Sequence, residues 1–479
     1  MLSSSRHDYF PVPVLYLAFF QSPTKPHPRD EILPVMDLAT IRTSLKSPQG
    51  VLCAGAAIRL ALFLGIPSLC HALERRPELS TPLTSFRSLK EGVFIHDQGS
   101  NPYDGGVFFH SPLYLLFFTY IVPVSSYLLT LLLWTSVDIG SAIALVRIWK
   151  SQNSKRNERK VSLILALFLF NPYTLLSCLA KSTTSIDNAI LLSAIAFAAT
   201  GQITGATFLL ALASHASLYP LLLLPPLAML LKQKSGTHLA SPVLLTAVSF
   251  VLFCAGLTGI IYLTASQSWI EQSWGVMFSI NVNDLTPNVG MWWYFFTEMF
   301  DHFRTFFLGV FQLHNLIYVA PICLRLSDDP LFAILIQVGI ISTWKSYPAL
   351  GDMAVWAGLL GCFPDVVSNL RHPLFTLTVH LYTSILLPLL HSLWLLTGTG
   401  NANFFYAATM VYGLNASLAV VDALGAGLRL QVKKQATDAL LREESEDRKS
   451  DGYEKDPEMM DEIWEQKGWS VVQFASSII

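Results

Sequence analysis

The stretch VLLTAVSFVLFCAGLTGIIYLTA occupies residues 243–265 and contains no charged side chain. An α-helix rises by about 1.5 Å per residue, so this stretch is about 35 Å long as a helix. The hydrocarbon core of a bilayer is roughly 30 Å thick, and the stretch is therefore expected to cross a membrane. The other predicted spans lie near residues 51–66, 113–134, 161–180, 186–200, 203–231, 303–324, 331–343, 349–364, 373–396 and 404–428.

These spans predict an all-α polytopic integral membrane protein with about ten to twelve transmembrane helices. The number of crossings within 161–231 stays open at roughly two to four, because prolines interrupt this stretch. The overall composition agrees with a membrane protein: of 479 residues, 13% are charged and 52% are hydrophobic, and the mean hydropathy is +0.47. A soluble chain usually has about twice that charged fraction, so the composition excludes a single water-soluble domain and a mainly disordered chain.

The small net charge of −2 provides no basic field for nucleic acid, and we expect no nucleic-acid partner. The six cysteines are scattered without a C-x-x-C pair, which favours buried thiols over a disulfide framework or a zinc site. The sequence contains no P-loop, HExxH, GxSxG or dinucleotide-binding glycine motif. We therefore expect no cofactor.

The distribution of lysine and arginine predicts the orientation in the membrane. Residues 147–160 contain six basic residues and one acidic residue, and the short loop 232–238 is also basic. Both loops are expected to face the cytosol. Counting spans outward from them places the loops near 67–112, 266–302 and 397–403 on the opposite side.

The same count places both chain termini in the cytosol and divides the chain into three parts. Residues 1–50 are interpreted as a cytosolic N-terminal extension, and residues 51–428 as the polytopic membrane domain. Residues 429–479 contain 8 basic and 12 acidic residues and are predicted to be a disordered cytosolic tail.

The loops opposite the basic side contain the candidate binding residues. Residues Trp292 to Phe296 are all aromatic and have the composition of an interfacial aromatic belt. The asparagines of the loop 397–403 have side chains that suit sugar hydroxyls or phosphate oxygens, although Asn also favours helix N-caps. The polar candidates are Asn401 and Asn403, with Asp284, Thr286 and Asn288 behind them, and the aromatic candidates are Trp293 and Tyr294.

Two further groups of ionisable residues have both a functional and a structural interpretation. Glu298, Asp301 and His302 are spaced to share a helical face that would ligate a divalent metal, or they form a solvated face. Lys181 and Asp187 lie where one predicted helix ends and another begins, and a charge pair joining the two ends is the structural interpretation.

The loop 67–112 carries separated acidic and basic residues. Its segment 83–97 is predicted to be an amphipathic helix, followed by a turn-rich stretch. This loop is interpreted either as a substrate loop or as a structured cap over the helix bundle.

Several strings of the sequence resemble those of a known family. The string DLTPNVGMWWYFFTEMFDHF at 284–303 resembles the signature of the phosphatidylinositol-glycan class U family. Further similar strings are NPYDGGVFFH at 101–110, NPYTLLSCLAKST at 171–183, SLYP at 217–220, KSYP at 345–348 with Gly351-Asp352, and NFFYA at 403–407. The similarity runs from about residue 51 to about residue 428.

The resemblance implies a function that composition alone does not. Members of this family are the polytopic subunit of the glycosylphosphatidylinositol (GPI) transamidase in the endoplasmic reticulum membrane, with a fold like that of the GT-C type membrane glycosyltransferases. By implication the chain is not itself the enzyme: it recognises or presents the GPI lipid, and the cysteine nucleophile lies on another, caspase-like subunit. Its partners would be the other transamidase subunits and the GPI lipid.

Two other functions are weighed against this expectation. A dolichol-phosphate-mannose-dependent GPI mannosyltransferase would place an acidic pair in the first lumenal loop, whereas the nearest acids here, Glu91, Asp97 and Asp104, are separated. A transporter or flippase would show inverted repeats and an ion site near the bilayer midplane. Neither feature is evident in the sequence.

Overall fold

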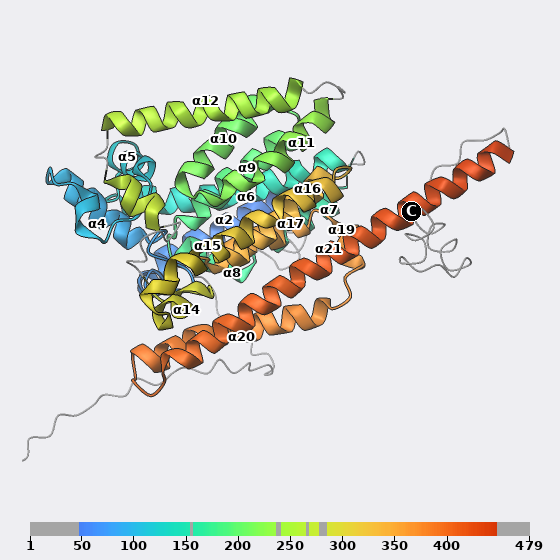
Figure 1. The fold of residues 1–479 in the computed structure, drawn as a ribbon. Coiled ribbons are helices and arrows are strands. Elements are labelled where there is room, and N and C mark those ends of the chain that lie inside the picture. Colours follow the sequence, from blue (N-terminus) through green and yellow to red (C-terminus); the bar gives the residue numbers. More distant parts are fainter. Residues whose placement is uncertain (1–46, 154–156, 236–240, 265–267, 277–284, 448–479) are drawn as a thin grey trace, which may run out of the picture. The chain divides into compact units, whose positions relative to one another are not determined.

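The computed structural model describes residues 47–153, 157–235, 241–264, 268–276 and 285–447 (Figure 1). Every regular element within these ranges is a helix, which confirms the predicted all-α class. The first half of the chain forms α2 (Pro48–Gly65), α3 (Pro67–Leu73), α4 (Phe86–Asp97), η1 (Pro102–Gly105), α5 (Pro112–Tyr120), α6 (Tyr127–Gln152), α7 (Glu158–Leu169), α8 (Pro172–Leu179), α9 (Thr184–Ala199), α10 (Ile203–Ala216), η2 (Tyr219–Leu223) and α11 (Leu224–Ser235).

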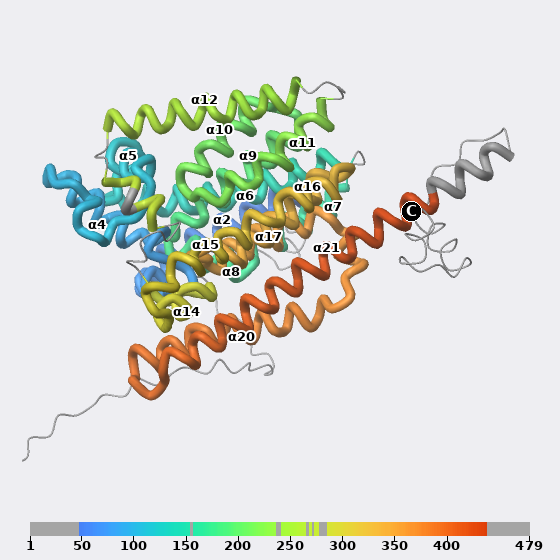
Figure 2. Tube along the Cα trace, viewed as in Figure 1, coloured from blue at the N-terminus to red at the C-terminus, as the bar shows by residue number. Residues whose placement is uncertain are grey.

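The second half follows the same pattern of helices joined by short connections (Figure 2). It forms α12 (Ser241–Thr264), η3 (Ile270–Gly275), α14 (Trp292–Glu298), α15 (Asp301–Ile317), α16 (Val319–Arg325), α17 (Pro330–Trp344), α18 (Leu350–Leu360), α19 (Pro364–Ser368), α20 (Pro373–Leu395) and α21 (Ala402–Asp447). The amphipathic helix expected over 83–97 is present as α4, which begins three residues later.

Six helical segments in the described part of the chain are long and apolar enough to cross a membrane. They are α2, α6, α12, α15 with α16, α20 and the apolar part of α21. A seventh results if α7 and α8, which are bent by 50° relative to each other, form one span. By the criterion of helix length, the described part of the chain therefore has six or seven candidate spans, fewer than the expected ten to twelve transmembrane helices.

The difference arises because several predicted spans are shorter or broken in the structure. Helices α9, α10, α17 and α18 are apolar but have only 16, 14, 15 and 11 residues. A helix of 15 residues is about 22 Å long, which is less than the bilayer core. The predicted span 203–231 is divided near Pro220 into α10 and α11, and the predicted span 113–134 is divided near Pro123 into α5 and α6.

These short helices lie inside the bundle. Helix α17 is buried along nearly its whole length, and the largest apolar core contains residues of α6, α9, α10, α17 and α18. Helices α12 and α20, by contrast, expose most of their apolar side chains and lie along opposite edges in Figure 1. A short helix is tolerated at membrane depth because its ends contact protein instead of lipid.

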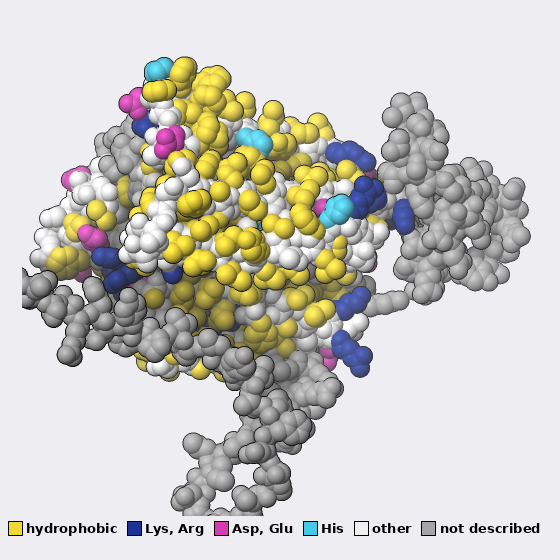
Figure 3. Space-filling view, turned by 90° about the horizontal axis from the view of Figure 1, so that it is seen from below, with side chains coloured by type: hydrophobic (Ala, Val, Ile, Leu, Met, Phe, Trp, Pro, Cys, Tyr) yellow, Lys and Arg dark blue, Asp and Glu magenta, His cyan; other side chains and the backbone are white. Residues whose placement is uncertain are grey.

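The two ends of the bundle differ in charge, and we name them by their residues. The basic end contains 147–153, 232–235 and 325–330, where Lys234 Nζ donates to the Ser151 carbonyl at 3.1 Å. The loop end contains 67–112, 285–300 and 396–401. Figure 3 shows lysine and arginine side chains gathered at the right of the view, beyond a wide apolar surface. This pattern is typical of a membrane protein with one strongly basic side.

Helix α21 continues past the predicted end of the membrane domain. It runs from Ala402 to Asp447, so the helix includes the first 19 residues of the segment 429–479 that the sequence predicts as a disordered tail. Helix formers such as Lys433 and Ala436 continue the helix there, and no proline or glycine interrupts it before residue 447. Residues 448–479, like residues 1–46, lie outside the described ranges.

A buried ion pair joins two of the long helices. Arg59 on α2 donates through Nε to Asp138 Oδ2 on α6 at 2.8 Å, and the two side chains are 0% and 4% exposed. Arg59 Nη1 also donates to the Gly55 carbonyl at 3.1 Å. Each charge compensates the other, because either one alone would be very unfavourable in this apolar interior.

Replacement of Arg59 by methionine should leave the Asp138 carboxylate buried and unpaired. We expect Arg59→Met to lower the free energy of unfolding by about 3–5 kcal/mol, and the double variant Arg59→Met/Asp138→Leu to recover most of this loss. Thermal unfolding of the purified protein in detergent measures both effects. A double variant as unstable as the single variant would show that the ion pair itself is not what joins α2 and α6.

Candidate functional site

A cavity of about 630 Å³ opens at the loop end of the bundle. Its wall comes from the turn after α3, the first half of α4, the residues after η1, the segment before α14, and the C-terminal half of α20. The lining residues are Glu74, Arg75, Pro77, Ser80, Thr81, Pro82, Ser85, Arg87, Ser88, Glu91, Gly106, Val107, Phe109, Thr286, Pro287, His391 and Leu395. Two of the three predicted loops, 67–112 and 266–302, therefore meet at one site.

Local sequence explains how the first loop forms this wall. Ser85 caps α4, with its hydroxyl accepting from the Ser88 amide at 3.5 Å, and this fixes where the helix begins. Gly106 adopts a φ of +66°, which glycine tolerates best, and it turns the chain back toward α4. The Ser88 hydroxyl then donates to the Val107 carbonyl at 2.6 Å. These contacts join α4 to the stretch that follows η1.

The lining residue Glu74 connects the cavity to the membrane bundle through an ion pair with Lys181. Lys181 Nζ lies 2.7 Å from Glu74 Oε1, and the two side chains are 2% and 9% exposed. Lys181 has a φ of +50° and is the non-glycine residue with positive φ in the described part of the chain. The ammonium group also lies 5.5 Å and 5.2 Å from the ring centres of Phe86 and Tyr127.

The prediction that Lys181 pairs with Asp187 is wrong. Asp187 instead accepts a hydrogen bond from the Tyr114 hydroxyl at 2.5 Å. Lys181 has its left-handed backbone in the turn between the end of α8 and the start of α9 at Thr184, and its side chain bonds to Glu74 at the loop end. The Thr183 amide donates to the Thr84 carbonyl at 2.9 Å and reinforces this connection.

The opposite wall of the cavity is held by Arg76. Its Nη1 donates to the Ser392 hydroxyl at 3.0 Å and to the Pro388 carbonyl at 3.3 Å, both on α20. His391 and Leu395 lie on the same half of α20 and line the cavity. The turn after α3 is therefore fixed both to α20 and, through Glu74, to Lys181 beside α8.

An aromatic cluster continues from this wall toward the turn between α20 and α21. It consists of Trp293, Tyr294, Trp394, Phe405 and Tyr406, with Trp293 stacked on Trp394 at a centroid distance of 6.0 Å. His391, which lines the cavity, lies 5.3 Å from the Phe405 ring. The cluster thus connects the cavity to the third predicted loop.

The expectation of an interfacial aromatic belt at 292–296 is only partly met. Trp292, Trp293 and Phe296 are buried, with exposed fractions of 3%, 4% and 1%. They pack against other aromatic rings of the protein, because the helix α14 is short and lies against its neighbours. Trp293 remains close to the candidate site, whereas a belt residue would face the lipid headgroups.

The remaining polar candidates are distributed around this cavity. Thr286 is exposed and lines it. Asn288 is 1% exposed and shapes the turn, since its Oδ1 accepts from the Gly290 amide at 2.8 Å and its Nδ2 donates to the Thr286 carbonyl at 3.2 Å. Asp284 lies outside the described residues. Asn288 therefore positions Thr286 and does not itself face the opening.

The two asparagines of the third loop lie beyond the aromatic cluster. Asn401 caps α21, because its Oδ1 accepts from the Phe404 amide at 3.2 Å. Asn403 is exposed and accepts a hydrogen bond from the Tyr294 hydroxyl. Neither asparagine lines the cavity, but Asn403 connects the third loop to the segment that contains Thr286.

The structure separates the residues considered as metal ligands. Helix α14 ends at Glu298 and α15 begins at Asp301, so the break at 299–300 removes the shared helical face. Asp301 forms an ion pair with Arg304 at 3.0 Å. Within the described ranges, no group of three His, Cys, Asp or Glu side chains is arranged to hold a metal ion.

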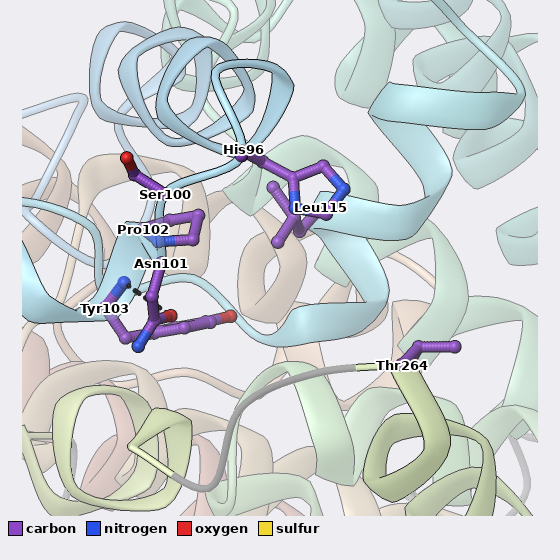
Figure 4. A pocket seen from close by; sticks show the side chains of 8 residues that line it. His96, Ser100, Asn101, Pro102, Tyr103, Leu115 and Thr264 are labelled. Atoms are coloured by element: carbon purple, nitrogen blue, oxygen red, sulfur yellow. Dashed lines mark hydrogen bonds between the residues drawn. The ribbon is translucent and has the colours of Figure 1, made fainter.

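A second, smaller cavity of about 260 Å³ lies between the end of α4, η1, α5 and the end of α12. Figure 4 shows Asn101 and Tyr103 on one side of it and Thr264 on the other. Asn101 Nδ2 donates to Asp104 Oδ1 and to Ser268 Oγ, both at 2.7 Å. Asn101 therefore joins the first two loops, and Asp104 is occupied as a hydrogen-bond acceptor.

All six cysteines are free, as expected, and four of them are buried. Cys70 lies on α3 at the loop end, where burial raises the pKa of its thiol. A raised pKa keeps the sulfur protonated at neutral pH, and a protonated thiol is a poor nucleophile. This position therefore does not favour covalent chemistry.

Comparison with known proteins identifies the family. The family described as GPI transamidase subunit PIG-U matches residues 53–412. The chain belongs to the PIG-U family. It is 33% identical over 442 residues to the mouse GPI-anchor transamidase component PIGU, with 82% of this chain and 98% of the mouse protein covered.

Other PIG-U relatives agree over a similar length. The chain is 35% identical over 393 residues to the GPI transamidase component GAB1 of Saccharomyces cerevisiae, covering 81% of this chain and 95% of the yeast protein. It is 33% identical over 443 residues to the human GPI-anchor transamidase component PIGU, covering 82% of this chain and 98% of the human protein. The family match includes the cavity, the aromatic cluster and both asparagines of the third loop.

Sequence reasoning missed the charged lining of the cavity. Arg75 and Arg87 lie among the separated charges of the loop 67–112, Glu91 was considered only as an acid of the mannosyltransferase alternative, and His391 lies within a predicted span. Arg87 and Glu91 are four residues apart on a predicted amphipathic helix, and this spacing places them on one face. The spacing is the feature of the sequence that could have indicated a charged lining. Which residues lie across the cavity from Arg87 and Glu91 depends on tertiary packing, and the sequence alone does not show it.

His110 provides a pH-dependent test of how this end of the molecule is folded. Its ring is 1% exposed, lies between Phe108 and Tyr114, and follows the cavity residue Phe109. Burial lowers the pKa of His110 from 6.5 to about 3. The neutral ring is therefore favoured in the folded state, and this contribution to stability is complete above pH 6.5 and lost as the pH falls toward 3.

We expect the folded protein to lose about 2 kcal/mol of stability between pH 7 and pH 5 through His110 alone. The variant His110→Phe keeps an aromatic ring but cannot be protonated, and its stability should depend less steeply on pH by that amount. Thermal unfolding of both proteins in the same detergent at pH 7 and pH 5 measures the difference. Equal pH dependence would contradict the buried, neutral state of His110.

Proposed function

We propose that this chain is a subunit of a GPI transamidase and that it holds the polar head of the GPI lipid at the loop end of the bundle. In this proposal the protein is a multi-pass protein of the endoplasmic reticulum membrane, with the loop end in the lumen and both termini in the cytosol. The chain presents the lipid for attachment to the C-terminus of a proprotein. The cysteine nucleophile belongs to another, caspase-like subunit.

The cavity is the observation that carries the proposal. It brings α4, Thr286 and α20 to one polar opening of about 630 Å³, which is within the range of roughly 300–1,000 Å³ that small ligands occupy. Hydroxyl groups of Ser80, Thr81 and Ser85 provide neutral contacts that suit sugar hydroxyls. The aromatic cluster leads from this opening to Asn401 and Asn403, which we retain as head-group contacts at its rim.

The acyl chains of the lipid need a different kind of surface. Helix α20, which lines the cavity with His391 and Leu395, exposes most of its other apolar side chains. Acyl chains gain little from moving between bilayer and protein, since both surroundings are apolar. Specificity for a GPI lipid therefore depends on the head-group contacts at the loop end.

A non-catalytic role agrees with the chemistry of the cavity. Of the acids considered for a mannosyltransferase, Glu91 lines the cavity, while Asp97 and Asp104 do not. The second lining acid, Glu74, is paired with Lys181 and is not available as a general base. We keep the glycosyltransferase-like fold as part of the proposal, because the family resemblance implies it.

A large side chain at position 286 should close the cavity without disturbing the fold, because Thr286 is exposed. We expect Thr286→Trp to reduce the GPI lipid that co-purifies with the assembled complex at least about fivefold. The matched control is Thr399→Trp, which places the same side chain at an exposed site of the loop end outside the cavity. Lipid extraction and mass spectrometry measure the bound GPI. Equal loss in both variants, or none in either, would contradict the assignment.

Asn401 allows charge to be tested separately from folding. Aspartate is as good an N-cap as asparagine, so Asn401→Asp should keep α21 intact while adding a negative charge near a lipid phosphate. We expect weaker GPI attachment with Asn401→Asp and normal attachment with the neutral cap Asn401→Ser, at equal subunit assembly. A reporter protein with a GPI signal, quantified at the cell surface, measures the effect. Normal attachment with the aspartate variant would remove Asn401 from the site.

A further inference from the structure

Several charges around the cavity have no ion-pair partner among the residues that the structure describes. Arg75 is exposed on the turn after α3, and Arg87 is exposed on α4. Among the described residues, no carboxylate lies within ion-pair distance of either guanidinium. Glu74, the acid beside Arg75, is already paired with Lys181 at 2.7 Å. Within the described ranges, the lining charges without an ion-pair partner are therefore Arg75, Arg87 and Glu91, with a net charge of +1.

The N-terminus of α4 adds to this positive field. Helix α4 has 12 residues, and its first turn lines the cavity through Ser85, Arg87 and Ser88. That turn contains no acidic residue, so no side chain of the turn compensates the positive end of the helix dipole. Free amide groups at such a helix end are suited to bind an anion.

A buried hydroxyl in the same wall also lacks a partner. Ser80 Oγ is inaccessible to solvent, and no hydrogen bond to it is formed in the described structure. Unpaired buried polar groups are rare in folded proteins, and Ser80 is one of the residues that line the cavity. Ser80 follows the turn that contains Arg75, so the unpaired hydroxyl and the unpaired guanidinium lie on the same wall.

We propose that this cavity binds a phosphate ester that carries a hydroxylated ring, with the phosphate held by Arg75, Arg87 and the N-terminus of α4. Arginine suits this task because its planar guanidinium donates two parallel hydrogen bonds to phosphate oxygens. The ring hydroxyls would be bound by Ser80, Thr81 and Thr286, and Glu91 would accept from a further hydroxyl. This inference rests on the proposed function and specifies which part of the lipid head the cavity recognises.

The chemistry distinguishes this ligand from other lipid heads. A neutral sugar would leave both guanidinium groups without a counter-charge, and diacylglycerol has neither phosphate nor ring. A phosphate ester without a ring would use the two arginines but leave the hydroxyl-lined part of the cavity, with its volume of about 630 Å³, largely empty. Phosphoinositol chemistry, whether in the anchor lipid or in an ordinary membrane phosphoinositide, satisfies both parts.

The test measures binding of defined probes to the purified full-length protein in detergent. The probes are dioctanoyl phosphatidylinositol, dioctanoyl phosphatidylethanolamine and dioctanoylglycerol, with myo-inositol 1-phosphate as a soluble competitor. The variant is Arg75→Gln/Arg87→Gln, and both positions are exposed, so the fold should be retained. The control is Arg304→Gln, which removes one positive charge from the first turn of α15, outside the cavity.

We expect the double variant to bind dioctanoyl phosphatidylinositol at least about tenfold more weakly, because charge-assisted hydrogen bonds are lost. Arg304→Gln should bind this probe as the unmodified protein does, and dioctanoylglycerol should bind all three proteins equally. Myo-inositol 1-phosphate should compete if the phosphate ester itself is recognised, whereas competition only by the lipid would assign the binding to the acyl chains. That second result, or unchanged affinity in the double variant, would overturn the inference.

The same experiment separates this inference from the proposed function. If the unmodified protein binds dioctanoyl phosphatidylinositol through the two arginines but never retains a GPI lipid, the phosphate site stands and the proposed function is wrong. If GPI lipid is retained equally by the unmodified protein and by the double variant, the proposed function stands and the arginine site is wrong. Phosphatidylethanolamine bound as tightly as phosphatidylinositol would exclude the hydroxylated ring.

Discussion

The ion pair between Lys181 and Glu74 is the contact on which the organisation of the loop end depends. Its 2.7 Å bond joins the first loop to the point where α8 ends and α9 begins. Both side chains are nearly inaccessible to solvent, so neither charge has water as an alternative partner, and separation of the pair would be costly. The left-handed backbone of Lys181 is maintained because this pair and the Thr183–Thr84 hydrogen bond hold it in place.

From this fixed point the other contacts of the site follow. The Leu350 amide donates to the Glu78 carbonyl, and Arg76 bonds to α20, so the first loop is tied to three separate parts of the membrane bundle. The cavity forms between these attachments and the segment that contains Thr286. Backbone and hydroxyl groups need hydrogen-bond partners, and the interior of a membrane provides none. A polar opening of this kind therefore suits the loop end and would be unfavourable in the middle of the bilayer.

The sequence was sufficient for the helical class, the basic end and the family resemblance, because apolar stretches and lysine–arginine bias are local properties. It predicted ten to twelve spans, whereas six or seven helical segments of the described chain meet the length criterion, because the lengths of α9, α10, α17 and α18 depend on where packing ends each helix. Of the residues that line the cavity, the sequence analysis selected Thr286 but not Arg75 or Arg87, because which side chains lie across the cavity from them depends on tertiary packing. Asn401 and Asn288 proved to be a helix cap and a turn former, and spacing alone does not separate these roles from ligand contact.

The central claim is that the loops containing Gln98, Thr286 and Thr399 share one side of the membrane, opposite the loop that contains Gln152. Single cysteines at these four positions, in a cysteine-free background and in sealed microsomes, can be labelled with a membrane-impermeant maleimide. We expect the cysteine at 152 to react at once and those at 98, 286 and 399 to react only after the membrane is permeabilised. Reaction of any of the latter three in sealed microsomes would show that the loops do not form one lumenal site.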